Sequence, residues 1–229
     1  MLEIAGIDAA YGHAVVLHDV SLDLEEGQMA FVIGRNGAGK TTLLRTIMGL
    51  LKPRKGSIRY LGSDVTGALP EDLYRKGFRY VPQDKRVFGD LTVRENIEIA
   101  AYSSREPLRL ALDKVMSIYP KLEKFLDMKA GKLSGGQRQI LLVGQALVGD
   151  PKLLLIDEPT QGLAAVVVDD IARILTGLRG RVSAIVVEQN LPLMRRLADK
   201  VFALKEGKIS MALSGEADIA GTQSFDQFM

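Results

Sequence analysis

Two stretches of this sequence combine glycine with hydroxyl-bearing side chains in the way that phosphate binding requires. The first, GRNGAGKT, covers residues 34–41 and follows the apolar run MAFVI. Its glycines let successive backbone N–H groups converge on phosphate oxygens, an approach that a Cβ atom would obstruct. Lys40 can bridge the β- and γ-phosphates of a nucleotide, and Thr41 offers a hydroxyl to Mg²⁺. A strand before the pattern and a helix after it, as expected here, are the context that it needs.

The second stretch, LSGGQRQ, covers residues 133–139 and leads into the helical pattern ILLVGQALVG. Ser134 stands where an N-cap residue would, and two glycines follow it. The start of a helix attracts anions, because its unpaired N–H groups and the helix dipole both point outward. The chain therefore has two phosphate-binding candidates far apart in sequence.

An acidic pair, Asp157 and Glu158, ends the apolar run LLLID. A buried strand would hold Asp157 rigidly at the carboxyl edge of a parallel sheet, where ligands of open α/β sheets bind. Asp157 could then orient Mg²⁺ through a water, and Glu158 could polarise a water aimed at the γ-phosphorus. Such a pair at a strand end often has no function, so the glycine-rich loop is what favours this interpretation.

The elements that must position these residues follow an alternating pattern. Short apolar runs rich in β-branched residues indicate strands buried on both faces, as in a parallel sheet covered by helices. These runs are residues 29–34, 79–82, 153–157 and 183–189. Two N-terminal stretches, 2–12 and 20–28, partly alternate between apolar and polar residues, which predicts an antiparallel layer with one wet face.

Between Gln83 and Leu133 the pattern becomes helical. Thr92 with Glu95 three residues later predicts a capping box. Pro107 and Pro120 suit the start and the end of a further helix that carries a single apolar face. An all-helical lobe inserted between strands is therefore expected. In the polar tail, residues 214–229, only the first residues are expected to be ordered.

Composition excludes several classes of function. The chain has 229 residues, enough to bury a substantial core, and 30 Lys and Arg against 28 Asp and Glu give no case for a nucleic-acid groove. The lack of cysteine excludes disulfides, thiolate metal sites and cysteine nucleophiles. No signal-peptide pattern stands at the start, and no apolar run reaches the ~18 residues of a membrane span. We therefore expect neither export by a signal peptide nor a membrane crossing.

The set GRNGAGKTT, YVPQ, LSGGQRQ, LLLIDEP and VVEQN, in this order, resembles the ATP-binding cassette ATPases of ABC transporters. The resemblance extends from Leu2 to about Leu213. It implies an α/β P-loop NTPase core with a mainly parallel sheet, an N-terminal antiparallel β layer and an inserted α-helical subdomain. One cassette domain is expected over 1–229, with the core in 1–82 and 151–229 and the helical subdomain in 83–150.

The resemblance also accounts for the second phosphate site. It implies that two cassettes face head to tail, so that the LSGGQ helix of one closes on the γ-phosphate held by the other. The signature residues acting on the partner's nucleotide are then Leu133, Ser134, Gly135, Gly136 and Gln137. The residues expected to bind the chain's own ATP are Tyr11, Val16, Gly34, Arg35, Asn36, Gly37, Ala38, Gly39, Lys40, Thr41 and Thr42.

The resemblance also assigns roles to further residues by their position in the sequence. Tyr11 matches the aromatic residue on which adenine stacks, although a lone tyrosine in a β segment more often serves packing. Gln83 in YVPQ matches the glutamine that joins the Mg²⁺ site to the helical subdomain and senses the γ-phosphate. The resemblance thus implies Mg²⁺ ligation by Thr41, Gln83 and Asp157, and catalysis by Lys40, Glu158 and Gln189.

Two positions depart from the family pattern. Gln189 stands where many cassettes have a histidine that contacts the γ-phosphate; it can donate a hydrogen bond but carries no proton or charge. Ala164 stands where many relatives have an aspartate that crosses the dimer interface. His13 and His18 lie too early in the chain to replace the histidine. Both departures count against full hydrolytic activity in a homodimer. Because of Gln189, a protein that binds nucleotide for regulation but does not hydrolyse it remains an alternative function.

VVEQN and VFGDLTVRENI are similar to segments of ATPases of branched-chain amino acid importers and their urea or amide relatives. The expected function is ATP hydrolysis that energises import of branched-chain or other hydrophobic amino acids, from the cytoplasmic face of the membrane. Expected partners are a second cassette, membrane permeases docked beside Gln83, and, indirectly, an extracytoplasmic solute-binding protein. A urea or amide importer and a cassette ATPase of the assembly type remain alternatives.

Overall fold

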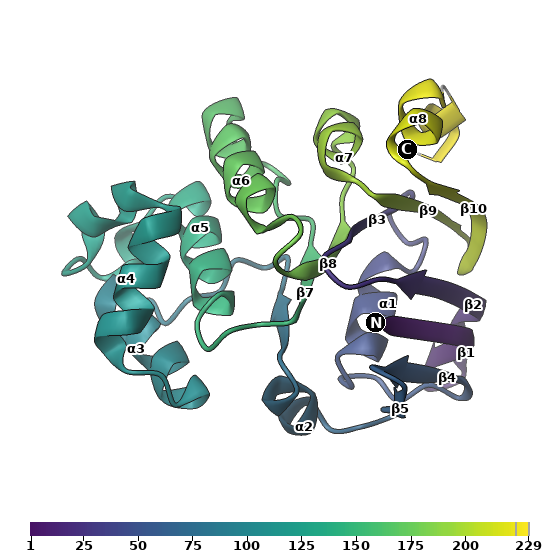
Figure 1. Ribbon diagram of the computed structural model, residues 1–229, viewed down its shortest axis with the longest axis horizontal. Helices are drawn as coiled ribbons and strands as arrows, with labels where there is room; N and C mark the ends of the chain where they lie inside the picture. Colours follow the sequence, from purple (N-terminus) through teal and green to yellow (C-terminus); the bar gives the residue numbers. More distant parts are fainter. Residues whose placement is uncertain (223, 229) are drawn as a thin grey trace.

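The computed structural model describes residues 1–222 and 224–228 (Figure 1). A six-stranded sheet runs through the core in the order β10-β9-β3-β8-β7-β6, and every pairing in it is parallel except that of β9 with β10. Its strands are β3 (Met29–Ile33), β6 (Phe78–Val81), β7 (Leu153–Asp157), β8 (Ser183–Val187), β9 (Lys200–Lys205) and β10 (Lys208–Ser214).

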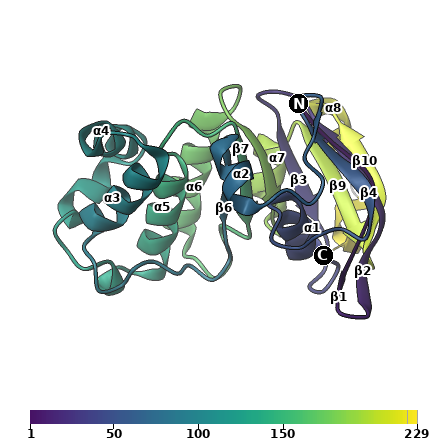
Figure 2. The ribbon, with the colours of Figure 1, turned by 90° about the horizontal axis from the view of Figure 1, so that it is seen from below.

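A second, antiparallel sheet has the order β2-β1-β4-β5. Its strands are β1 (Leu2–Tyr11), β2 (Ala14–Leu24), β4 (Lys55–Tyr60) and β5 (Ser63–Asp64). Helix α1 (Lys40–Ile47) lies between the two sheets (Figure 2) and buries Leu43, Leu44 and Ile47 in the apolar layer that joins them. The predicted N-terminal antiparallel layer is therefore confirmed.

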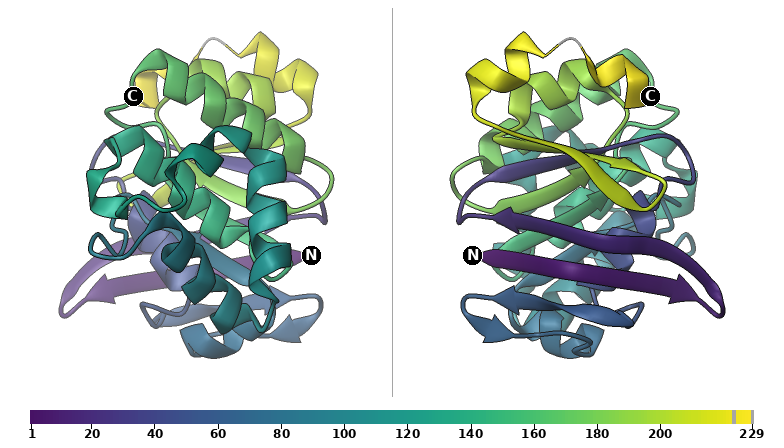
Figure 3. Two further views of the ribbon diagram at one scale, coloured as in Figure 1. Left: turned by 90° about the vertical axis from the view of Figure 1, so that its left-hand side faces the viewer. Right: turned by 90° about the vertical axis from the view of Figure 1, so that its right-hand side faces the viewer.

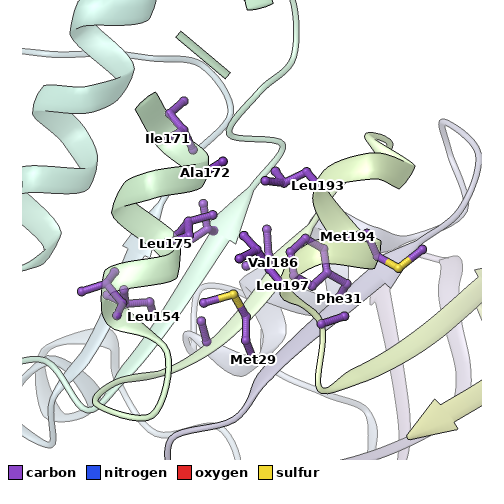
Figure 4. Packing of buried hydrophobic residues seen from close by; sticks show 14 of the residues in the cluster. Met29, Phe31, Leu154, Ile171, Ala172, Leu175, Val186, Leu193, Met194 and Leu197 are labelled. Atoms are coloured by element: carbon purple, nitrogen blue, oxygen red, sulfur yellow. The ribbon is translucent and has the colours of Figure 1, made fainter. Parts of the chain in front are cut away.

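The central strands bury both faces, as their uninterrupted apolar sequences predict. In β3, Ala30 and Val32 face the layer around α1, whereas Phe31 and Ile33 join a cluster on the opposite face. Two helices, α6 (Ala165–Leu178) and α7 (Leu191–Leu197), cover that opposite face (Figure 4). This two-sided burial holds the carboxyl ends of the parallel strands in a fixed row.

The inserted lobe is helical, as predicted, and stands at one end of the molecule (Figures 1 and 3). Helices α3 (Val93–Ser104), α4 (Leu108–Ile118) and α5 (Gly135–Ala146) enclose a separate apolar cluster, and α2 (Pro70–Arg75) precedes β6. Two 3₁₀ turns, 120–125 and 130–132, connect α4 to α5. The capping box of Thr92 and Glu95 is confirmed, because the hydroxyl of Thr92 accepts from the N–H of Glu95 and the Glu95 carboxylate accepts from that of Thr92.

The expectation of a largely unordered tail was wrong. After β10 the chain forms α8 (Glu216–Gly221) and a 3₁₀ turn over 224–228, and Phe225 is fully buried against the core. Arg195 holds the tail on the core through its guanidinium group. This group donates to the backbone oxygens of residues 219, 220 and 222, and it lies 5.0 Å from the centre of the Phe225 ring. Residues 223 and 229 of this tail lie outside the described residues.

None of the helices in the described ranges 1–222 and 224–228 has the length and hydropathy needed to cross a bilayer.

Replacing the buried Phe225 by Ala should destabilise the fold by about 3–5 kcal/mol, because it removes an aromatic side chain from a packed cluster. Urea unfolding followed by circular dichroism measures this change. The neighbouring Gln227 is exposed, so Gln227→Ala serves as the control and should unfold at the wild-type midpoint. A Phe225→Ala midpoint equal to that of the control would show that the tail does not contribute to the core.

Candidate functional site

The glycine-rich loop joins the end of β3 to the start of α1, and close packing behind it excludes larger residues. A Cβ atom at Gly34 would lie 2.3 Å from the backbone oxygen of Leu204 in β9. At Gly39, the N-cap of α1, φ is 107° and a Cβ atom would lie 2.8 Å from a methyl carbon of Leu17. The loop therefore lies directly on β2 and β9, and it leads into the start of α1, where unpaired N–H groups and the helix dipole favour an anion.

The loop borders a polar cavity of about 420 Å³. Its lining combines predicted nucleotide-binding residues with side chains from distant parts of the sequence: Val16, Asn36, Gly37, Gly39, Lys40, Thr41, Thr42, Gln83, Glu158 and Gln161. All but Gln161 are predicted site residues. The carboxyl ends of β3, β6 and β7 thus converge where parallel-sheet topology places ligand sites.

Lys40 is 4% exposed, and its ammonium group donates to the backbone oxygens of Gly34 at 2.7 Å and Arg35 at 3.2 Å. The same ammonium lies 3.4 Å from Oε1 of Glu158. A buried cation with these partners is fixed at the mouth of the loop, where it can neutralise phosphate oxygens.

Glu158 receives contacts on both carboxylate oxygens. Oε1 faces Lys40 and accepts from Nε2 of Gln189 at 3.2 Å, while Oε2 accepts from Nε2 of Gln83 at 3.1 Å. The residue is 5% exposed and its φ is +45°, a left-handed conformation that non-glycine residues rarely adopt. The carboxylate is thus held in one direction, into the cavity.

Asp157 precedes Glu158 and ends β7 in full burial. Its Oδ2 accepts from the hydroxyl of Tyr80 at 3.2 Å, whereas Oδ1 is buried without a hydrogen-bond partner. Burial raises the pKa of this carboxyl, and the nearby Thr41 hydroxyl partly offsets the increase. An unpaired buried carboxylate oxygen next to a hydroxyl fits a hard cation such as Mg²⁺, so the predicted ligand set of Thr41, Gln83 and Asp157 is chemically consistent.

Gln189 follows β8 and connects the acidic end of the site to the glycine-rich loop. Its Nε2 donates to Oδ1 of Asn36 at 2.7 Å as well as to Glu158. The amide therefore supplies the donor contacts that a histidine could make at this position, without adding a charge.

The signature residues, predicted as a second phosphate site, lie at the start of α5 and do not line this cavity. Ser134 is the N-cap and shares a capping box with Gln137. A Cβ atom at Gly135 would meet nothing within 4 Å, but one at Gly136 would lie 2.7 Å from a methyl carbon of Val167 in α6. Within the described residues, the cavity lining includes none of residues 133–137. Gly135 thus leaves open space at the helix start, whereas Gly136 permits close packing of α5 on α6.

Other residues singled out in the sequence do not line the cavity. Gly34, Arg35 and Ala38 belong to the glycine-rich loop but do not line the cavity. Tyr11 lies at the end of β1 with 43% of its surface exposed, and its hydroxyl accepts from Arg45 at 3.4 Å. It is accessible for stacking but stands outside the polar cavity. Ala164 is the N-cap of α6 and provides no side-chain cap, a role that an aspartate would fill.

Sequence reasoning missed two members of the site. Oε1 of Gln161 accepts from Nε2 of Gln83 at 2.6 Å, and the backbone oxygen of Gln161 accepts from the ammonium of Lys85 at 2.5 Å. These bonds join the loop after β6 to the loop after β7. Neither residue belongs to a motif with a fixed identity, so only the proximity of the two strand ends could have indicated the contact.

Comparison with known proteins agrees with this geometry. A family model described as ABC transporter matches residues 17–161. The chain belongs to the ABC transporter family. It is 37% identical to the high-affinity branched-chain amino acid transport ATP-binding protein BraG of Pseudomonas aeruginosa, over 100% of this chain and 99% of that protein. It is 34% identical to the probable branched-chain amino acid transport ATP-binding protein LivF of Archaeoglobus fulgidus, over 95% and 93%.

Solved structures of ATP-binding cassettes resemble the whole chain. A nucleotide-free cassette from an ABC transporter has a TM-score of 0.88 and 28% identity, covering 100% of this chain and 96% of its own. A dimeric cassette in a post-hydrolysis state bound to ADP and Pi has a TM-score of 0.83 and 26% identity, covering 93% and 98%. The predicted family and fold class are thereby confirmed, and this cassette has a nucleotide-binding fold.

Gln189→Glu should slow steady-state ATP hydrolysis by roughly ten- to a hundredfold, because it removes a donor to Glu158 and adds a like charge beside that carboxylate. Phosphate release measures the effect. Gln28 also contacts a glutamate, Glu25, but at the opposite end of β3, so Gln28→Glu is the matched control and should keep the wild-type rate. Equal rates in both variants would mean that Gln189 does not act on Glu158.

Proposed function

We propose that this cassette is the ATP-hydrolysing, energy-coupling subunit of an importer for branched-chain or other hydrophobic amino acids. The observation that carries the proposal is the full-length similarity to branched-chain amino acid transport ATP-binding proteins. The cavity agrees with it, because the glycine-rich loop and the Glu158 carboxylate line the same space. Amino acids are the solutes named for those relatives. An importer subunit of this kind works at the cytoplasmic face of the cell membrane.

In the proposed reaction, the loop over 34–41 holds the triphosphate and Lys40 neutralises its β- and γ-oxygens. Bound Mg²⁺, held by Thr41, Gln83 and Asp157, would screen the phosphate charge. Glu158 orients a water toward the γ-phosphorus and accepts its proton on a carboxylate oxygen. The new P–O bond forms as the bond from the γ-phosphorus to the β-γ bridging oxygen breaks, which yields ADP and phosphate. Gln189 and Gln83 keep the Glu158 carboxylate aimed.

A second cassette completes the site in this proposal. The start of α5 offers Ser134 and the space beside Gly135, yet this surface lies outside the cavity of its own chain. In a head-to-tail pair it would approach the γ-phosphate bound to the neighbour, and its N–H groups and helix dipole would favour the negative charge. ATP then joins the two subunits, and its hydrolysis weakens their contact.

A groove between the two lobes suits the permease contact. It has a volume of about 790 Å³ and is lined mainly by α2, by the end of α3 and by the residues that precede β6 and β7. Its floor contains Arg79, which is 5% exposed and stacks on Tyr74 at 3.5 Å. Arg79 lies in β6, the strand that leads to Gln83. A permease segment seated here would therefore contact the strand that leads to Gln83, the proposed γ-phosphate sensor.

Glu158→Gln should retain ATP binding but slow phosphate release by at least about 100-fold, because the amide cannot accept the proton of the attacking water. ATP should then accumulate in a stable cassette dimer, which size-exclusion chromatography with ATP and Mg²⁺ detects. Lys40→Ala, which weakens phosphate binding, is the comparison variant and should remain monomeric. Wild-type turnover by Glu158→Gln would refute the assigned role.

Purification of the tagged chain from native membranes should recover multi-span permeases, and mass spectrometry identifies them. Lys76→Glu should reduce this recovery several-fold, because it reverses a charge on the groove. Arg59→Glu, a reversal on the exposed side of β4, should leave recovery unchanged. Recovery of soluble partners alone would favour an assembly-type ATPase, and urea or amide permeases would assign the related importer class.

A further inference from the structure

A buried carboxyl group that does not line the nucleotide cavity lies where the loop after β8 meets the loop after β7. Glu188 directly follows β8 and is 2% exposed. It precedes Gln189 in the chain, but it does not line the nucleotide cavity. Burial of a carboxyl group costs free energy unless its oxygens accept hydrogen bonds. The hydrogen-bond partners of Glu188 therefore indicate its role.

The partners of Glu188 come from both loops. Its Oε1 accepts from the hydroxyl of Thr160 at 2.5 Å, and its Oε2 accepts from the backbone N–H of the same residue at 3.4 Å. The backbone N–H groups of Gln189 and Asn190 also stabilise its charge, against the burial that raises its pKa. Thr160 is itself 7% exposed, so the contact lies wholly inside the protein.

This contact fixes the backbone on one side of Glu158. On the other side, the N–H of Glu158 donates to the backbone oxygen of Val187 at 2.9 Å. Residues 158 and 160 are thus attached to residues 187 and 188, with Pro159 between them. The left-handed φ of Glu158, +45°, costs about 1–3 kcal/mol for a non-glycine residue and persists only where the surroundings enforce it. The Val187 and Glu188 contacts help to hold this conformation, together with the N–H of Gln161, which donates to the backbone oxygen of Glu158 at 3.3 Å.

We propose that Glu188 is a positioning residue for hydrolysis, which holds Thr160 so that the neighbouring Glu158 carboxylate stays aimed into the nucleotide cavity. It does not touch the nucleotide. Its effect passes through Thr160 to the backbone of Glu158, and through Gln189 to the side chain of Glu158. The inference rests on the proposed role of Glu158 as the group that orients the attacking water.

Thr160→Val tests the contact with little change in shape, because it replaces the hydroxyl by a methyl group. It should lower kcat for ATP about tenfold, since small displacements of a catalytic group slow a reaction strongly. KM for ATP should change less than about twofold, because the phosphate-binding loop is untouched. Thr160→Ser restores the hydroxyl and should recover most of kcat.

Thr176→Val is the matched control. Thr176 lies in α6, is itself exposed, and donates its hydroxyl to the backbone oxygen of Ala172 at 2.7 Å. The same substitution there removes a similar hydrogen bond far from Glu158, and kcat should stay at the wild-type value. Thermal unfolding of both valine variants separates a positioning effect from a loss of stability, because only positioning gives a lower kcat at equal Tm.

Glu188→Gln tests the other side of the contact. An amide has one accepting oxygen, and its NH₂ group would face one of the N–H donors that surround the carboxyl. It should therefore lower kcat as Thr160→Val does. The double variant should be no slower than the slower single variant, because residues that act through one contact are not additive.

The outcomes separate this inference from the proposed function. If Glu158→Gln abolishes turnover while Thr160→Val and Thr160→Ser share the wild-type kcat, Glu188 is not a positioning residue and the role of Glu158 stands. If Glu158→Gln itself turns over normally, the proposed function fails first. A loss of kcat in Thr160→Val that is matched by raised KM and lowered Tm, without recovery in Thr160→Ser, would also overturn the inference.

Discussion

The carboxylate of Glu158 is the group on which the other parts of the site converge. A charge that is 5% exposed must have partners, and here these are the ammonium of Lys40 and the amides of Gln83 and Gln189. Each partner follows a different strand: Lys40 begins α1 after the loop that leaves β3, Gln83 follows β6 and Gln189 follows β8. A shift of any one strand would therefore leave a buried charge incompletely paired, and this links the register of the sheet to the chemistry of the site.

Two apolar layers keep those strand ends in place. The layer around α1 joins the two sheets, and the layer under α6 and α7 covers the opposite face of the parallel strands (Figure 4). Because protein interiors are close-packed, a strand buried on both faces cannot move alone. The loops at the carboxyl ends can thus hold polar contacts whose geometry is set by the core.

The sequence predicted those features of the fold and site that depend on neighbouring residues in the chain. The glycine-rich loop, the capping box of Thr92 and the strand that ends at Asp157 are each specified by neighbouring residues, and the structure contains all three. The hairpin β9-β10 and the buried Phe225 were not predicted, because their burial depends on distant elements. For the same reason no sequence motif predicts the hydrogen bonds of Gln161 with Gln83 and Lys85. These residues meet because β6 and β7 are neighbours in the sheet.

The packing of Gly136 on Val167 gives the two predicted phosphate sites of one chain a physical connection. Helix α5 begins at the signature and touches α6 where only a glycine fits. Helix α6 begins just after the loop that contains Glu158 and Thr160. A displacement of the signature helix relative to α6 would change this close contact, and α6 is joined directly to the loop that holds the carboxylate. In the proposed head-to-tail pair, the start of α5 that would serve the partner's nucleotide is thus packed on the helix that follows the Glu158 loop of its own chain.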